Sequence, residues 1–168
     1  MRIKIKNQSD ELMSGPGDVY AKEISTAGAA FSYAIYEHSK LPLRVFEAGR
    51  LATAMINGCE ICKNWQSKRD IKQMGIKGGV IENGEAPDDQ FYQDLLNNDL
   101  SNLNHQERLA FQYAQAMGNE PKKLAQDDKF WDELKKVFSD GEITDLTYCI
   151  AGWMGMGRVA HVLGLDRS

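Results

Sequence analysis

Apolar residues at helical spacing dominate this 168-residue sequence. Between residues 19 and 38, Ile24, Ala27, Phe31 and Ile35 recur at intervals that place them on one face of a helix. Comparable patterns cover residues 43–56, 103–121, 127–140 and 142–163. We therefore expect an all-α fold, a single domain over residues 1–168 with about six to seven helices.

Two regions interrupt this pattern. Residues 75–90 are rich in turn residues and predict a loop, which a short helix near residues 91–97 follows. The only alternating segment, RIKIK at residues 2–6, has no second strand to pair with. We expect residues 1–18 to form a mobile or oligomer-bound arm. For the last two helices, we expect Asp127 or Asp128 and then Asp140 as N-caps.

Charge and hydropathy argue against nucleic-acid and membrane partners. The formal net charge is −4 and the basic residues are spread out, whereas a nucleic-acid binder usually has a concentrated basic face. The longest nearly charge-free run, YCIAGWMGMG, is about half the length that a membrane-spanning helix needs. Because the first residues lack an apolar signal segment, we expect a cytoplasmic protein.

The cysteines carry the clearest chemical signal. Cys59 and Cys62 form a C-x-x-C, and Cys149 lies in the apolar last helix, where we expect a core position. The pair has three interpretations: a working dithiol, half of a zinc site, or inert apolar filler. Zinc usually takes four ligands, and the remaining candidates form no second pair: Cys149, His38, His105 and His161. We favour the dithiol, and we expect neither a metal nor a cofactor.

The position of the pair suits thiol chemistry. Asn57-Gly58 is a break signal, so both cysteines fall in the first turn of a helix that we expect to end at Gly75. Unpaired N–H groups at a helix start stabilise a thiolate. A thiol with an ordinary pKa of about 8.5 is mostly protonated at neutral pH, so this placement raises the reactive fraction.

The segment LPLRVFEAGRLATAMINGCEICKNWQ, residues 41–66, resembles the carboxymuconolactone decarboxylase superfamily and, within it, the alkylhydroperoxidase D-like proteins. That family has a glutamate twelve residues before the first cysteine, an Asn-Gly-Cys turn, the C-x-x-C and a histidine four residues later. The residues in register here are Glu47, Asn57, Gly58, Cys59 and Cys62. The resemblance continues through residues 75–76 and 138–153 to Arg158, and so covers most of the chain.

The sequence departs from the family at two positions. Gln66 stands where the family has its histidine, and Ile61 stands between the cysteines, where the family often has an aromatic residue or histidine. Glutamine cannot take a proton near neutral pH, although its amide can hold a water molecule. His38 and His161 are candidate substitutes by number only.

Glu47 is the expected proton-transfer group. A lone glutamate on an apolar helix usually lies at its solvent edge, but this one stands beside Val45 and Phe46, close to the expected buried face. A carboxyl in such surroundings has a raised pKa and can exchange protons near neutrality. The family register supports a catalytic role for Glu47.

The resemblance implies a thiol-dependent peroxidase. Cys62 would attack the peroxide, Cys59 would exchange with an external thiol reductant, and Glu47 would accept a proton, through water held by Gln66. Family members are typically homo-oligomers, trimers or hexamers. Two alternatives are a cofactor-free lyase of the decarboxylase branch, which needs no dithiol, and a non-catalytic oligomeric helical protein with a vestigial dithiol.

Overall fold

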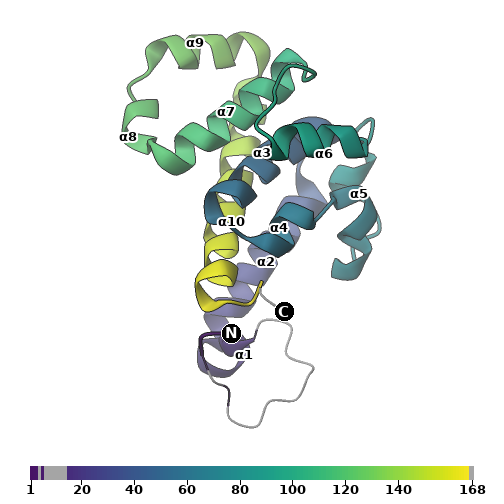
Figure 1. Ribbon diagram of the computed structural model, residues 1–168, viewed down its shortest axis with the longest axis vertical. Coiled ribbons are helices and arrows are strands. Elements are labelled where there is room, and N and C mark those ends of the chain that lie inside the picture. Colours follow the sequence, from purple (N-terminus) through teal and green to yellow (C-terminus); the bar gives the residue numbers. More distant parts are fainter. Residues whose placement is uncertain (4, 6–14, 167–168) are drawn as a thin grey trace.

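The computed structural model describes residues 1–3, 5 and 15–166. This part of the chain folds into ten α-helices and two short 3₁₀ helices, and it contains no strand (Figure 1). The expected all-α class is confirmed, whereas the expected number of six to seven helices is too low. The excess comes from short segments, since α1, α4, α5 and α8 have only four or five residues each.

The long helices agree with the apolar pattern to within three residues at each end. In chain order the elements are α1 (Pro16–Tyr20), α2 (Lys22–His38), α3 (Leu43–Asn57), α4 (Glu60–Asn64), α5 (Ser67–Asp70), η1 (Ile71–Met74), η2 (Gly79–Glu82), α6 (Asp89–Leu96), α7 (His105–Asn119), α8 (Pro121–Leu124), α9 (Asp128–Val137) and α10 (Asp140–Leu163).

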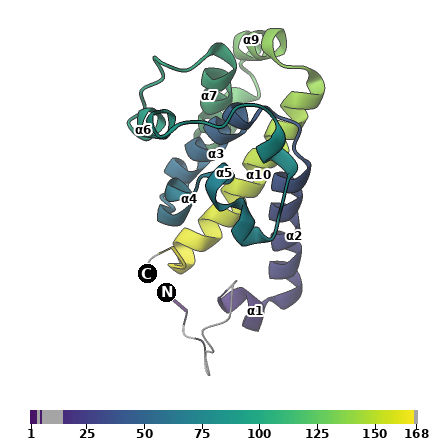
Figure 2. The ribbon, with the colours of Figure 1, turned by 90° about the vertical axis from the view of Figure 1, so that its right-hand side faces the viewer.

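Helix α3 is the centre of the core. Twelve of its fifteen residues are buried, and it packs against α7 on one side and α10 on another (Figures 1 and 2). Phe46 and Leu51 of α3, Phe111 of α7 and Leu146 of α10 are fully buried. Each such side chain contributes about 1.5–3 kcal/mol. Because α3 is covered on nearly all sides, it also carries the polar side chains of Glu47 and Arg50 into the interior.

Helix α10 is the longest and runs beside α2 and α3 (Figures 1 and 2). A capping box opens it: Ser139 Oγ accepts the Glu142 N–H at 3.3 Å, and Glu142 Oε2 accepts the Ser139 N–H at 2.8 Å. The prediction that Asp140 is the N-cap of this helix is therefore wrong, since Asp140 is its first helical residue. The prediction for α9 is confirmed, because Asp127 is its N-cap. Among the described residues, no helix combines the length and apolar character needed to cross a membrane.

The cysteine segment is not the single helix that the sequence predicts. It is divided into α4, α5 and η1, and the chain is extended at Trp65 and Gln66, with ψ angles of 136° and 116°. The break coincides with two hydrogen bonds from the buried Arg50, which donates to the carbonyls of Cys62 and Trp65. Gly75 ends the segment as predicted, in the left-handed region at φ +75°.

The N-terminal arm is described only in part. Residues 4 and 6–14 lie outside the described residues, so the alternation over residues 2–6 is not tested as a whole. Residues 1–3 form no strand, and the Arg2 N–H donates to the Leu163 carbonyl at 2.8 Å. Helix α1 falls inside the expected arm, and the expected loop over residues 75–90 contains η2.

A pair of glycines tests how tightly the chain packs on α2. Gly79 and Gly75 have nearly the same φ, +77° and +75°, but a Cβ on Gly79 would lie 2.4 Å from the Tyr36 carbonyl oxygen, whereas one on Gly75 would contact nothing within 4 Å. Both alanine substitutions incur the left-handed strain of about 1–2 kcal/mol. We expect Gly79→Ala to cost about 1–3 kcal/mol more than Gly75→Ala in urea unfolding, because backbone must move. Equal losses would contradict this packing.

Candidate active site

Cys59 and Cys62 are joined by a disulfide, with their Cα atoms 5.2 Å apart. Cys59 is the N-cap of α4, and its Sγ accepts the Cys62 N–H at 3.3 Å. The two cysteines differ in exposure: Cys59 is 0 % exposed, whereas Cys62 is partly exposed. The C-x-x-C is thus placed for disulfide chemistry, with one sulfur buried and the other near the surface.

A cavity of about 240 Å³ lies beside this pair. Cys62 lines it and Cys59 does not. Most of its wall is apolar, and the larger contributors are Tyr36, Trp65, Met74, Trp153 and Met156, from α2, η1, α10 and the turn after α4. Among the described residues, Arg50 is the only charged one in its lining. Cys62 therefore faces a largely apolar space that a small organic molecule can occupy.

A buried ion pair lies under the cavity. Arg50 Nε donates to Glu47 Oε1 at 2.9 Å, and Nη2 donates to Oε2 at 3.0 Å. Glu47 is 0 % exposed and Arg50 2 %. Although burial alone would lower the Arg50 pKa, the charge and hydrogen bonds of Glu47 raise it, so the guanidinium stays protonated. Both groups are buried in the core, where their mutual hydrogen bonds make that burial tolerable.

Two further side chains complete the surroundings of Glu47. The Ser67 hydroxyl donates a short hydrogen bond to Oε1. Burial, together with the neighbouring Glu47 charge and a hydrogen bond to it, raises the Tyr92 pKa, so this phenol stays protonated. The carboxylate therefore has donors from three elements: α3, α5 and α6.

Arg50 connects this ion pair to α4, the helix that carries Cys62. Its Nη1 donates to the Cys62 carbonyl and its Nη2 to the Trp65 carbonyl, each at 2.6 Å. These carbonyls belong to the last turn of α4, where no helical N–H is available to them. The guanidinium thus acts as a C-terminal cap, and it fixes the position of the turn that carries Cys62.

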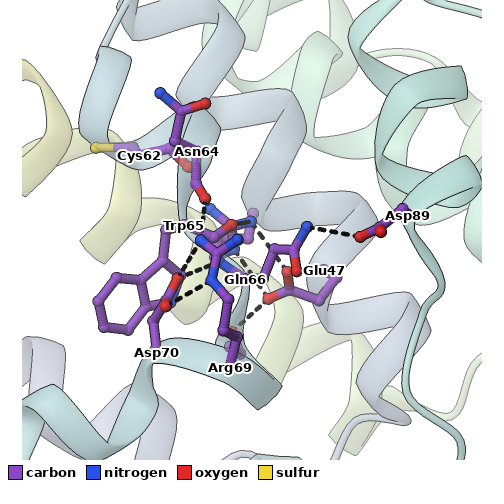
Figure 3. Close-up of polar contacts among 10 residues, drawn as sticks. Glu47, Cys62, Asn64, Trp65, Gln66, Arg69, Asp70 and Asp89 are labelled. Atoms are coloured by element: carbon purple, nitrogen blue, oxygen red, sulfur yellow. Dashed lines mark hydrogen bonds and ion pairs between the residues drawn. The ribbon is translucent and has the colours of Figure 1, made fainter.

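Glu47 does not line the cavity. In the view of Figure 3, the Cys62 sulfur points away from the Glu47 carboxylate. Arg50 contacts both residues, since its Nε donates to Glu47 Oε1 and its Nη1 donates to the Cys62 carbonyl. The link from the predicted proton acceptor to the predicted nucleophile therefore runs through Arg50. Asn57, another residue in the family register, holds the end of α3 to α10, since its Nδ2 donates to the Trp153 and Met154 carbonyls at 3.2 Å.

The Gln66 side chain points away from the Cys62 sulfur and toward Asp89 (Figure 3). Its Nε2 donates to Asp89 Oδ1 at 3.4 Å, and its backbone N–H donates to Asp70 Oδ2 at 2.9 Å (Figure 3). It is not part of the cavity wall, whereas Ile61 is. The structure therefore brings Glu47, Cys59 and Cys62 into one connected unit but does not bring Gln66 to the sulfurs.

The two candidate histidines have different surroundings. His38 is exposed at the end of α2, and it borders a separate groove near Cys149. His161 lies against the turn before the cysteines: its Nε2 is 3.3 Å from the position a Cβ on Gly58 would occupy. Its Nδ1 is 2.8 Å from Asp166 Oδ2, which also accepts the Glu60 N–H of α4 at 3.0 Å. This contact holds the chain after α10 to the start of α4.

The sequence reasoning missed Arg50, Ser67, Tyr92 and Asp166. Arg50 had a usable signal, because it lies three residues after Glu47 and so on the same helix face. Ser67, Tyr92 and Asp166 come from segments distant in sequence, and no local pattern marks them. Cys149 is in the core as expected, at 2 % exposure, and burial raises its pKa, which keeps this thiol protonated.

The comparisons with known proteins return no relatives. No protein-family model matches the chain, and neither the curated proteins nor the solved structures contain a match. Within the described residues, no group of three or more histidine, cysteine, aspartate or glutamate side chains could hold a metal ion. The functional proposal below therefore depends on the geometry of the site and on the motif resemblance.

Removing the buried guanidinium tests its structural importance. We expect Arg50→Met to lower the free energy of unfolding by about 3–5 kcal/mol, because Glu47 would keep a buried charge without its partner. Lys123→Met is the control, since Lys123 pairs with Glu120 at 3.1 Å but the two side chains are 71 % and 60 % exposed, and its loss should cost about 0–1 kcal/mol. Urea unfolding of both variants measures the difference. Similar losses in the two would contradict the assignment.

The Asp166 contact predicts a pH dependence of stability. Burial opposes ionisation of Asp166, but the hydrogen bonds from His161 and Glu60 outweigh it and lower the pKa below its ordinary value of 3.8. The carboxylate therefore stabilises the fold above that ordinary value, and the contribution is lost as the pH falls through the lower folded value. Asp166→Asn should be less stable than wild type at neutral pH and approach it in acid.

Thermal unfolding from neutral pH to strongly acidic pH measures this convergence. Asp132→Asn serves as the control, because Asp132 is exposed on α9 and its substitution should change little at any pH. A stability loss for Asp166→Asn that stays constant in acid would show that the carboxylate charge is not the cause.

Proposed function

We propose that this protein is a thiol-dependent antioxidant oxidoreductase that reduces peroxides through a Cys59–Cys62 dithiol and disulfide cycle. The observation that carries the proposal is the cysteine pair itself, joined in a disulfide, with Cys62 lining an apolar cavity. The resemblance to alkylhydroperoxidase D-like proteins of the carboxymuconolactone decarboxylase superfamily supports the same chemistry. In the proposed cycle the oxidant is a peroxide and the electrons come from an external thiol.

The first half of the cycle takes place in the cavity. The Cys62 thiolate attacks one peroxide oxygen, the O–O bond breaks, and the departing alkoxide takes a proton and leaves as an alcohol. Cys62 becomes a sulfenic acid. The Cys59 thiolate then attacks its sulfur, the S–O bond breaks as the disulfide forms, and the departing hydroxide takes a proton from solvent and leaves as water. Two electrons have passed from the two thiols to the peroxide.

Arg50 is the group that we assign to charge stabilisation. It is the only cation that the described part of the chain contributes to the cavity wall, and a neighbouring guanidinium favours the thiolate over the thiol. The four contacts described above use four of its five N–H groups, which leaves one Nη1 hydrogen for the oxygen that develops charge. Glu47 would act by holding Arg50, and Gln66 would act outside the cavity.

The lyase alternative has less support. A carboxylate substrate needs a cation with free donors, and the cation of this cavity has most of its donors in use. The non-catalytic alternative makes no use of the cavity beside Cys62, whereas the peroxidase proposal does. We therefore favour the peroxidase proposal.

Assembly and location form part of the same proposal. Helix α2 buries only Ile35 and Tyr36 in the chain, and it leaves Ile24 77 % exposed and Phe31 39 % exposed. Such an apolar face supports a homo-oligomer, a trimer or hexamer by the resemblance. A supply of thiol reductant suits the cytoplasm, the location expected from the sequence.

Treatment with one equivalent of cumene hydroperoxide tests the cycle. We expect the Cys59→Ser variant to accumulate a sulfenic acid on Cys62, because no resolving thiol remains, and dimedone followed by mass spectrometry will detect it. The wild type should instead lose two thiols as a disulfide and keep Cys149 as a thiol. The Cys62→Ser variant is the matched control and should consume no peroxide. If it consumed hydroperoxide at the wild-type rate, the proposed nucleophile would be wrong.

A further inference from the structure

We propose that the external reductant attacks the Cys62 sulfur through the cavity, and that Cys59 leaves as a buried thiolate that never contacts the reductant. The inference rests on the proposed dithiol cycle. It reverses the assignment implied by the motif resemblance, in which Cys59 exchanges with the reductant. Cys62 then performs both reactions with external molecules, and Cys59 reacts only with Cys62.

The two sulfurs differ in their accessibility to an external thiol. A thiolate must reach a disulfide sulfur from the side opposite the bond that breaks, so the attacked sulfur needs open space. Cys62 is partly exposed and lines the cavity of about 240 Å³. Cys59 is 0 % exposed and is absent from the cavity wall. An incoming thiol can therefore reach Cys62 without rearrangement of the fold, whereas attack on Cys59 requires α4 to move.

The hydrogen bonding of the pair also bears on which sulfur leaves. The Cys62 N–H donates to Cys59 Sγ at 3.3 Å, and a donor directed at a sulfur stabilises its thiolate form. A sulfur whose thiolate is stabilised is the better leaving group in disulfide exchange. Burial opposes a charge on Cys59, and this N–H contact offsets part of that cost. Access then decides for Cys62 as the attacked sulfur and Cys59 as the leaving group.

The reductant reduces the Cys59–Cys62 disulfide in two steps. One thiolate of the reductant bonds to Cys62 Sγ, the Cys59–Cys62 bond breaks, and its electron pair remains on Cys59. A second reductant thiol then attacks the mixed disulfide at the reductant sulfur, a new disulfide leaves, and Cys62 is released as a thiolate. The reductant has lost two electrons and the protein has gained two, with both cysteines again reduced.

Single-cysteine variants test the assignment through the reverse reaction, in which a protein thiol attacks an external disulfide. In a Cys149→Ser background, one variant keeps only Cys62 (with Cys59→Ser) and the other keeps only Cys59 (with Cys62→Ser). Each is mixed with 4,4′-dithiodipyridine, an uncharged disulfide, and released thiopyridone is followed by absorbance. We expect Cys62 to react about tenfold or more faster than Cys59 in the folded proteins and at a similar rate in urea. A faster Cys59, or equal rates in the folded proteins, would overturn the inference.

Oxidised wild-type protein provides the second measurement, which does not depend on the variants. It is treated briefly with 2-mercaptoethanol, quenched with N-ethylmaleimide in acid and mapped by mass spectrometry. We expect the mixed disulfide on Cys62 and the maleimide on Cys59, and the opposite map would overturn the inference. If the protein fails to consume hydroperoxide but gives the expected map, the peroxidase proposal falls and the exchange assignment stands.

Discussion

The buried ion pair between Glu47 and Arg50 is the interaction on which the rest of the site depends. Placing two charges in the core of a helical domain is costly, and replacing such a pair by apolar side chains is often neutral or stabilising. This pair does more than neutralise itself, because the guanidinium also holds the Cys62 and Trp65 carbonyls. One side chain of α3 thus ends α4 and fixes the turn that carries the second cysteine.

The fold gives the two cysteines of the motif different surroundings. In sequence the two cysteines of the C-x-x-C are equivalent candidates, but in the fold Cys59 faces the interior and Cys62 faces an apolar cavity. The cavity wall comes from several elements, and Arg50 is the one charged group in it from residues 1–3, 5 and 15–166. The proposed roles of the two cysteines follow from this difference in access. Cys62 reacts with external molecules, and Cys59 reacts only with Cys62.

The parts that depend on local pattern could be predicted from the sequence. The apolar spacing predicts the long helices, and the cysteine spacing predicts the disulfide pair. The break at Trp65 could not be predicted, because its cause is Arg50, fifteen residues earlier and hidden in the core. The same applies to Gln66: its place in the motif suggests a role beside Cys62, but the extended backbone at this residue turns its amide to Asp89. His161 reaches Gly58 only through the packing of α10, which sequence distance does not reveal.

The most direct test of the account is the rate at which hydroperoxide converts the reduced protein to the Cys59–Cys62 disulfide in wild type and in Arg50→Lys. Lysine keeps the charge but cannot bridge a carboxylate and two carbonyls with a planar fork of donors. With folding verified by circular dichroism, stopped-flow tryptophan fluorescence will follow the reaction. We expect a rate at least about tenfold lower in Arg50→Lys, because Cys62 loses its fixed position and its donor. An unchanged rate would contradict the central role of Arg50.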